Sequence, residues 1–216
     1  MHDVSDSASS VRDRKRSLTT RELIRAARLL TAEHGLPGFT VQELCDAAAV
    51  SRRTFFNYFA SKEDAVLGLP LERADVEAVA TFLRGGAPDS SDISPTLLRD
   101  LATLNEIRWR AMDVLPETIS DLMAAVEREP RLLSRMLDHA IGEEELDTRL
   151  IEQRENLPAG DPRARVAASI LASISRISAR QFFEPGNTDS FHDIFEAHVT
   201  ATRELFATQN PLIGLT

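Results

Sequence analysis

The sequence predicts an all-α fold in which a small N-terminal domain is followed by a larger helical body. Apolar residues recur at spacings of three and four through most of the 216 residues, as on one face of a helix. Hydroxyl residues stand three positions before acidic residues where several of these segments begin, a pattern typical of helix N-termini. Prolines and glycines fall mainly between the segments. No segment indicates a convincing strand, and no fixed-period repeat indicates a solenoid.

Composition bounds the class of protein. Hydrophobic residues make up 43% of the chain, enough for one compact unit or two subdomains that share a core. There is no run of eighteen apolar residues for a membrane span, and the polar first ten residues do not resemble a secretory signal. The single cysteine, Cys45, cannot form an internal disulfide and is expected to be buried. These features favour a cytoplasmic protein without a membrane partner.

Residues 1–17 are expected to form a disordered basic arm. They are rich in Ser and Asp, and four of the five residues from position 12 to position 16 are basic. The first helix is expected to begin at Thr19, with Glu22 completing a capping box, and to end before Gly35. Its inner face would hold Leu23, Ile24, Ala27, Leu30 and Thr31.

The stretch from Thr40 to Lys62 predicts two short helices joined by a tight turn. Thr40 and Glu43 form a second capping box before a helix over about residues 41–48, and Ser51 can cap the next helix. In that helix the aromatic residues should form the buried side, which leaves the polar residues for the other. The buried side would be Phe55, Phe56 and Phe59, and the outer side Arg52, Arg53, Thr54, Asn57 and Tyr58. This pattern predicts a helix-turn-helix domain over residues 18–62.

The second helix carries the groups that binding in a DNA major groove requires. Its N-terminus offers free amides and the positive end of the helix dipole to a phosphate. Arg52 and Arg53 can reach phosphates or the edge of guanine, and Thr54 can touch a thymine methyl group. Asn57 or Tyr58 can bond to a base edge or a phosphate. Taken alone, the two arginines would also fit a solvated amphipathic helix.

The order of residues in this stretch closely resembles the recognition segment of the TetR family of transcriptional regulators. The match covers Thr40, Val41, Leu44, Ala47, Val50, Ser51, Thr54, Phe55, Phe56, Tyr58, Phe59, Ser61, Lys62 and Glu63. Arg53 stands where the family commonly has glycine, and Phe56 where it usually has tyrosine. Arg53, Tyr58 and Lys62 are therefore expected to carry a larger share of the DNA contact. The resemblance implies a DNA-binding set of Thr40, Ser51, Arg52, Arg53, Thr54, Asn57, Tyr58 and Lys62.

Charge is divided unevenly along the chain, whose net charge is -9. Residues 1–62 contain ten basic residues against seven acidic ones, which leaves fifteen against twenty-seven for the rest. A basic front can approach the phosphate backbone while an acidic body is repelled, so one orientation of binding is favoured. The basic arm either stays solvated or lies against phosphates or in the minor groove, and both interpretations stay open.

The body, residues 63–216, is expected to be helical throughout. Ser61 and Asp64 would cap its first helix, and Pro70 would break that helix near Leu69. Residues 85–94 are expected to form a loop. Gly142 would be a weak point in a long helix, and Asp189 would cap the last one. The further helices are expected at residues 71–83, 95–114, 116–128, 130–155, 162–183 and 189–208.

The last two predicted helices are rich in small and apolar residues, which fits either an intramolecular core pair or a subunit interface. The TetR resemblance implies the second, a four-helix interface in a homodimer. Two recognition helices about 34 Å apart, one per subunit, would read a palindromic site. The expected interface residues are Ile170, Ile174, Ile177, Phe195, Val199 and Phe206.

Arg108 interrupts the apolar stripe of the helix expected at residues 95–114. Such a charge has an acidic partner, lies beside the anionic group of a ligand, or extends to the surface. Nearby residues could line a site for a small apolar or amphipathic ligand, although residues of these types are more often plain core. The candidate ligand-binding set is Phe82, Asn105, Arg108, Trp109, Met112, Met123, Met136 and His139.

Sequence motifs of enzymes are lacking. The chain has no glycine-rich phosphate loop, no G-x-S-x-G, no H-E-x-x-H and no E-x-x-H pair, so no catalytic residue, metal or cofactor is expected. We expect a homodimeric transcriptional regulator, a repressor rather than an activator, that a ligand in the body releases from its operator. The alternatives are a DNA-binding dimer without a small-molecule effector, and a helical carrier or adaptor without a DNA function.

Overall fold

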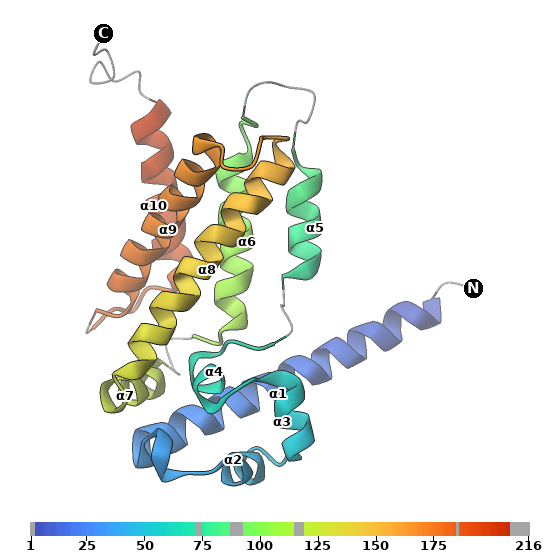
Figure 1. Ribbon diagram of the computed structural model, residues 1–216, viewed down its shortest axis with the longest axis vertical. Coiled ribbons are helices and arrows are strands. Elements are labelled where there is room, and N and C mark those ends of the chain that lie inside the picture. The colour runs from blue at the N-terminus through green and yellow to red at the C-terminus, as the bar shows by residue number, and fades with distance from the viewer. Residues whose placement is uncertain (1–2, 72–74, 87–92, 115–118, 185, 208–216) are drawn as a thin grey trace. The chain divides into compact units, whose positions relative to one another are not determined.

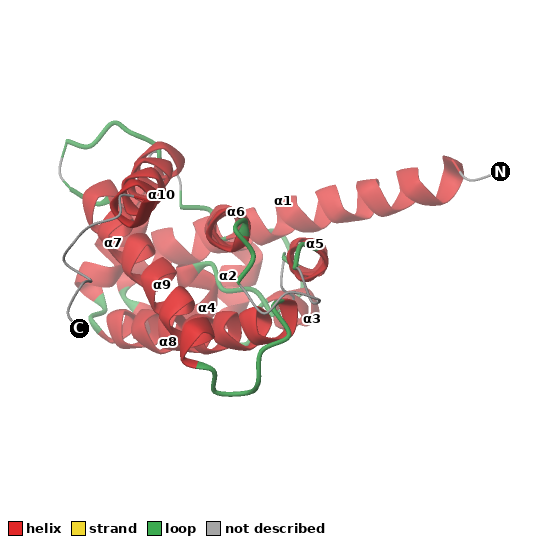
Figure 2. Ribbon diagram, turned by 90° about the horizontal axis from the view of Figure 1, so that it is seen from above, coloured by secondary structure: helices red, strands yellow, loops and turns green. Residues whose placement is uncertain are grey.

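The computed structural model describes residues 3–71, 75–86, 93–114, 119–184 and 186–207, and every regular element in these ranges is a helix (Figures 1 and 2). The predicted all-α fold is therefore confirmed. The elements are α1 Asp3–His34, η1 Leu36–Gly38, α2 Val41–Ala47, α3 Arg52–Tyr58, α4 Lys62–Leu67, α5 Val76–Arg84, α6 Leu97–Ala111, α7 Ile119–Arg128, α8 Arg131–Arg154, α9 Pro162–Phe182 and α10 Phe191–Ala207.

The chain divides into two compact units. The N-terminal unit comprises residues 1–74 and 109–137, and the C-terminal unit comprises residues 75–108 and 138–216. The boundaries fall within α6 and within α8, so the last turn of α6, all of α7 and the start of α8 belong with the helix-turn-helix segment. The sequence predicted a single domain boundary after residue 62. Each of the two compact units is instead made of two separate stretches of the chain.

Helix α1 begins at Asp3, so the expectation of a disordered arm over residues 1–17 and a helix start at Thr19 is wrong. Residues 1–34 contain no glycine or proline, and acidic residues precede the basic run, as the helix dipole favours. Thr19 acts as an interior residue: its hydroxyl donates to the carbonyl of Lys15 at 3.1 Å instead of capping. Residues 1–2 lie outside the described ranges.

A buried arginine on α1 joins several segments of the N-terminal unit. Arg28 is 1% exposed, and its guanidinium donates to the carbonyls of Val66, Asp113 and Met112 at 2.9, 2.8 and 2.9 Å. Burial lowers the pKa of Arg28 to about 10, against the opposing attraction of Asp113 and Asp121. Arg28 therefore connects α1 with α4 and with the segment after α6.

Helix α4 ends at Leu67, and Gly68 follows in the left-handed conformation with φ of 73°. A Cβ at this position would lie 2.4 Å from the carbonyl oxygen of Met112, so both the backbone angle and the close approach require glycine. The next helix begins at Val76. The predicted break near Leu69 is confirmed, and Gly68 makes the turn before Pro70 is reached.

In the C-terminal unit, α9 and α10 pack against each other through buried aliphatic and aromatic side chains. Phe191 stacks on Phe195 with ring centroids 5.5 Å apart. Helix α10 is capped by Ser190, whose hydroxyl accepts the amide N–H of Asp193 at 3.1 Å, and not by Asp189 as expected. Helix α8 continues through Gly142 without interruption.

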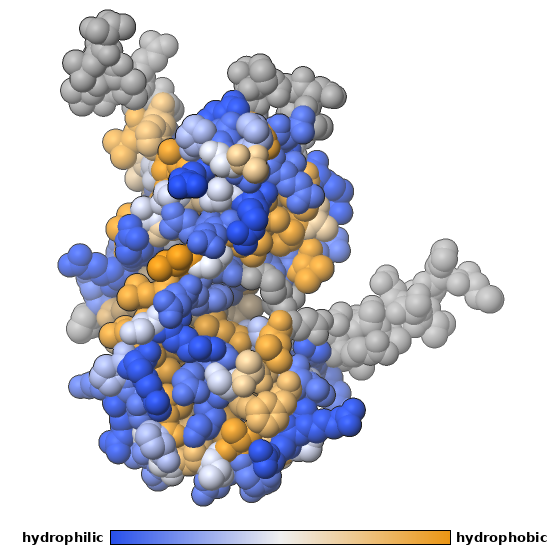
Figure 3. Space-filling view, in the orientation of Figure 1, coloured by the Kyte–Doolittle hydropathy of each residue, from blue (hydrophilic) through white to orange (hydrophobic). Residues whose placement is uncertain are grey.

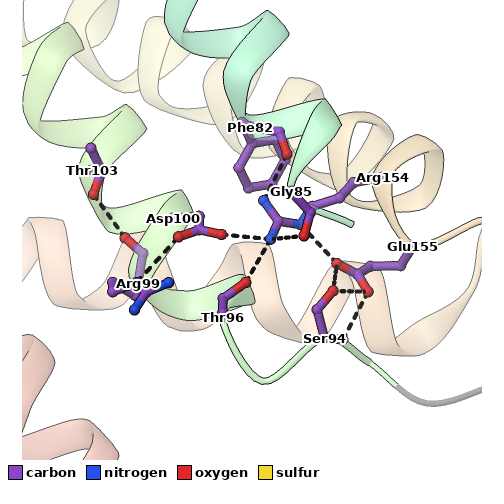
Figure 4. A network of polar contacts seen from close by, with 9 residues as sticks. All are labelled: Phe82, Gly85, Ser94, Thr96, Arg99, Asp100, Thr103, Arg154 and Glu155. Carbon is purple, nitrogen blue, oxygen red and sulfur yellow. Dashed lines mark hydrogen bonds and ion pairs between the residues drawn. The ribbon is translucent and has the colours of Figure 1, made fainter. Parts of the chain in front are cut away.

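A second buried arginine organises the start of α6 and the ends of α5 and α8 (Figure 4). Arg154 has a fully buried side chain that donates to the carbonyls of Phe82 and Gly85 at 2.7 and 3.0 Å and lies over the ring of Phe82. It also pairs with Asp100 at 2.6 Å and with Glu155 at 2.8 Å. Burial alone would raise the pKa of Asp100, but hydrogen bonds from Arg154 and Thr96 outweigh it and lower that pKa.

None of the helices in the described part of the chain is both long and apolar enough to cross a membrane.

Candidate nucleic-acid interface

Helices α2 and α3 begin at the two predicted caps. The hydroxyl of Thr40 accepts the amide N–H of Glu43 at 3.2 Å, and the Glu43 carboxylate accepts the amide N–H of Thr40 at 2.7 Å. The hydrogen bonds that the carboxylate accepts from the amide and the hydroxyl of Thr40 lower the pKa of the Glu43 carboxyl. Between the helices Ala49 adopts a φ of 52°, and the amide of Val50 donates to the carbonyl of Cys45 at 2.9 Å. The turn is therefore tight although it contains no glycine.

The inner side of α3 is narrower than the sequence predicted. Phe55 and Phe59 are fully buried, whereas Phe56 is 46% exposed and meets Phe55 edge to face at 5.2 Å. The expectation that Phe56 belongs to the buried side is wrong, because the helix is only two turns long and has room for one aromatic stripe. Leu44 and Cys45 of α2 are fully buried, and Cys45 is a free cysteine as predicted.

The outer side of α3 collects most of the predicted DNA-binding residues. Arg52, Arg53 and Asn57 are exposed, and Thr54 and Tyr58 are half-buried. The hydroxyl of Ser51 accepts the amide N–H of Thr54 at 3.0 Å and caps the helix, as predicted. Helix α3 contains no acidic residue, so its exposed surface has two positive charges and no negative one. This surface can attract phosphates and present an amide and a phenol to DNA.

Lys62 has a different place from the one expected. Its ammonium group donates to the carbonyls of Leu36 and Phe39 at 2.6 and 2.5 Å and lies 4.4 Å from the centroid of the Phe39 ring. Two of its three donors are therefore used within the protein. Lys62 ties the start of α4 to the η1 segment, and this leaves one donor for a phosphate.

Arg108 lies among carboxylates. Of the three alternatives that the sequence left open, this arrangement matches the pairing with acidic partners. Its Nε pairs with Asp75 at 2.6 Å, and its Nη1 pairs with Asp147 at 2.6 Å and with Glu143 at 3.2 Å. Burial alone would lower the pKa of Arg108, but these carboxylates outweigh it and raise that pKa. Asp75 and Asp147 are buried, and the side chain of Arg108 is 13% exposed.

The candidate ligand-binding residues do not fall within one unit. Phe82, Asn105, Arg108 and His139 belong to the C-terminal unit, and Trp109, Met112, Met123 and Met136 to the N-terminal unit. Met123 is 44% exposed, and Phe82 lies beneath Arg154. The C-terminal unit has a pocket of about 100 Å³ that contains none of these candidates. It is lined by Leu97, Leu98, Leu101, Ala167, Ile170, Thr202 and Phe206.

Five of the six predicted interface residues divide into a buried and an exposed group, and the sixth, Ile170, is half-buried and lines the pocket. Ile174, Phe195 and Val199 are 3%, 0% and 4% exposed, so within one chain they form the intramolecular core pair of α9 and α10. Ile177 and Phe206 are 49% and 67% exposed. Apolar residues at the C-terminal end of α10 are visible in Figure 3. Val166 and Leu205, which the predicted interface set did not include, are exposed on the same two helices. Helical periodicity alone does not say which apolar positions face inward.

One group of potential metal ligands occurs in the described part of the chain. Glu106 on α6 and His192 and Glu196 on α10 place their ligand atoms within 4.8 Å of one another. His192 Nδ1 lies 2.8 Å from the Glu106 carboxylate, so the two form an ion pair when the imidazole is protonated. The sequence predicted no metal site, and the His192–Glu106 pair accounts for the contact without one.

The fold and the outer side of α3 define a helix-turn-helix DNA-binding protein. Residues 23–67 match the family model of bacterial regulatory proteins of the tetR family. The chain is also 29% identical, over 202 residues, to the HTH-type transcriptional regulator TcmR of Streptomyces glaucescens, an alignment that covers 91% of this chain and 88% of that protein. Residues 23–67 thus carry the DNA-binding domain of tetR-type regulators, and the chain is similar over most of its length to a transcriptional regulator.

Proposed function

We propose that the protein is a homodimeric repressor that binds a palindromic operator and that a small molecule releases it from DNA. The observation that carries the DNA-binding part is the outer side of α3, where Arg52, Arg53 and Asn57 are exposed above the buried Phe55 and Phe59. The buried rings fix the helix, so the exposed groups keep a constant orientation. A basic helix of this kind enters the major groove with its N-terminal residues toward the bases.

Selection from random duplexes by the purified protein, followed by titration of the best duplex at several salt concentrations, tests this proposal. A palindromic sequence should be enriched, and its affinity should fall steeply as salt rises because phosphate counterions are released. Arg53→Ala should weaken binding by about tenfold and reduce the salt dependence by about one ion. Arg84→Ala removes an exposed arginine of the C-terminal unit, outside the helix-turn-helix, and is the matched control. Enrichment of no sequence would contradict the proposal.

Two buried donors on α6 support a small-molecule site in the C-terminal unit. Asn105 Nδ2 and Arg108 Nη2 are inaccessible to solvent and have no hydrogen-bond partner among the residues that the structure describes. They lie three positions apart and hence on one side of the helix. Buried donors without acceptors are unfavourable, and a ligand oxygen would satisfy them.

The charge around these donors indicates the chemistry of the ligand group. Three carboxylates already surround the guanidinium of Arg108, so its positive charge is fully compensated. A neutral acceptor such as a carbonyl, ether or hydroxyl oxygen is therefore favoured over a second anion. An amphipathic molecule would combine this acceptor with apolar contacts.

Native mass spectrometry of the purified protein, with thermal-shift screening of amphipathic compounds that carry carbonyl or hydroxyl groups, tests the ligand proposal. A compound that binds should dissociate the selected duplex. It does so by binding the DNA-free conformation more tightly than the DNA-bound one, because only this difference in affinity shifts the equilibrium. Asn105→Leu should abolish its binding, whereas Thr103→Leu, an exposed neighbour on α6, should not. If compounds bind equally well to Asn105→Leu, the donors are not part of the site.

A further inference from the structure

Tyr58 is the last residue of α3 and the one tyrosine in the sequence. Its backbone carbonyl accepts the amide N–H of Leu71 at 2.8 Å, and the next residue, Phe59, is fully buried. The main chain of Tyr58 is therefore fixed on both sides. Its ring is half-buried at the edge of the exposed side of α3, so its orientation depends on what the ring contacts.

Arg16 of α1 contacts this ring. Its guanidinium carbon lies 4.9 Å from the centroid of the Tyr58 ring, within the range of a cation–π interaction. Arg16 is half-buried, whereas Arg14 and Lys15 beside it are exposed. The hydroxyl of Thr20 donates to the carbonyl of Arg16 at 3.1 Å. Arg16 thus belongs to an ordered turn of α1, in the stretch that the sequence suggested would be disordered.

We propose that Arg16 is a positioning residue for DNA binding, which holds the Tyr58 ring so that its hydroxyl faces the DNA backbone. The proposal rests on the proposed function, in which Tyr58 contacts DNA. A guanidinium that lies over the ring restricts the rotation of the phenol and leaves its hydroxyl edge free. The ring then loses less conformational freedom when the complex forms. Arg16 acts through Tyr58 and does not itself supply the main phosphate contact.

The contact between the two residues can be measured without DNA. Because the chain has a single tyrosine, incorporation of fluorotyrosine labels Tyr58 alone, and its ¹⁹F NMR signal reports the surroundings of the ring. Arg16→Ala should shift the signal and narrow it as the ring becomes mobile. Arg14→Ala removes the same charge two residues away and should leave the signal unchanged. An unchanged signal in Arg16→Ala would overturn the proposal.

A double-mutant cycle on the selected duplex then tests the functional consequence. Arg16→Ala should weaken binding by about two- to fivefold in the wild-type background, the size of one such contact. It should have no effect in Tyr58→Ala, and the salt dependence should stay as in wild type. Equal weakening in both backgrounds, with a smaller salt dependence, would show a direct phosphate contact and overturn the proposal. Unaltered affinity of Tyr58→Ala itself would overturn the role of Tyr58, while Arg53→Ala separately reports the proposed function.

Discussion

Two buried arginines, Arg28 and Arg154, carry much of the polar organisation of the molecule. Each donates to backbone carbonyls of segments far away in the sequence: Arg28 reaches carbonyls 38, 84 and 85 positions away, and Arg154 reaches 69 and 72 positions away. An arginine is suited to this because its five N–H groups form a rigid planar array. The segments so joined depend on one side chain for their carbonyl partners.

Arg28→Met should lower the free energy of unfolding by about 3 kcal/mol, because two buried carbonyls and one partly buried carbonyl lose their donor. The relief of a buried charge offsets part of this loss. Urea unfolding followed by circular dichroism measures the difference. Arg25→Met, on the exposed side of α1 and paired only with Glu22 in the described contacts, is the control and should change stability little. A loss no greater than that of the control would contradict the role assigned to Arg28.

The Arg154 network predicts a pH dependence through Asp100. The pKa of Asp100 in the folded protein lies below its ordinary value of 3.8, so the network stabilises the fold above that pH. The contribution is lost as the pH falls through the lower, folded pKa. Asp100→Asn should therefore be less stable than wild type at neutral pH, and the difference should shrink at pH 3. Equal differences at both pH values, measured by urea unfolding, would rule out the ion pair as its source.

Residue roles were predictable where the partner is local and not where it is distant. The caps at Thr40, Ser51 and Ser61 follow from residues three positions apart, and all three form as predicted. The partners of Arg108 are 33 and 39 positions away, so the sequence could state only that it needed a partner. Lys62 donates to backbone carbonyls. Every residue has such a carbonyl, so the sequence pattern could not identify these acceptors.

At the scale of elements, two glycines have different roles because one lies at the end of a helix and the other lies inside one. Gly68 ends α4 with a positive φ and faces the Met112 carbonyl, whereas Gly142 lies inside α8, where an added Cβ would meet nothing within 4 Å. The sequence marked Gly142 as a weak point and placed the break after α4 at Pro70, because glycine and proline are both poor in helix interiors. Tertiary contact separates the two glycines: one is required and the other is not.

Gly68→Ala should lower the free energy of unfolding by more than about 2 kcal/mol, since it forces a methyl group against a backbone oxygen and strains φ. Gly142→Ala should raise it by about 0.5–1 kcal/mol, because alanine loses less backbone entropy in a helix. The two variants are matched controls for each other in one thermal unfolding experiment. Similar shifts of the same sign would contradict the close approach at Gly68.

Helix α1 shows that a capping-box sequence does not by itself locate the start of a helix. A Thr19–Glu22 pair looks like a start, but an uninterrupted run without glycine or proline lets the helix begin sixteen residues earlier, at Asp3. A capping box satisfies free amides only if the preceding residue leaves the helix, which sequence alone does not decide.

At the scale of the whole molecule, assembly depends on apolar surface that one chain leaves uncovered. Ile177 on α9 and Leu205 on α10 are 49% and 69% exposed, and the proposed dimer would bury them. Ile177→Asp should yield a monomer by sedimentation velocity and weaken operator binding by about a hundredfold or more, since the second half-site is lost. Leu71→Asp changes an apolar residue of the N-terminal unit that is at least as exposed, and this variant should remain dimeric. A dimeric Ile177→Asp protein would place the interface elsewhere.

Because Cys45 is buried, the rate at which this single thiol is modified measures local unfolding of the protein. Its side chain is inaccessible within α2, and burial raises the pKa of the thiol, so the reactive thiolate is scarce in the folded protein. A thiol reagent can modify it only when the helix-turn-helix opens. The rate of modification therefore reports how often the DNA-reading element unfolds locally, and bound operator should slow that rate in proportion to its occupancy.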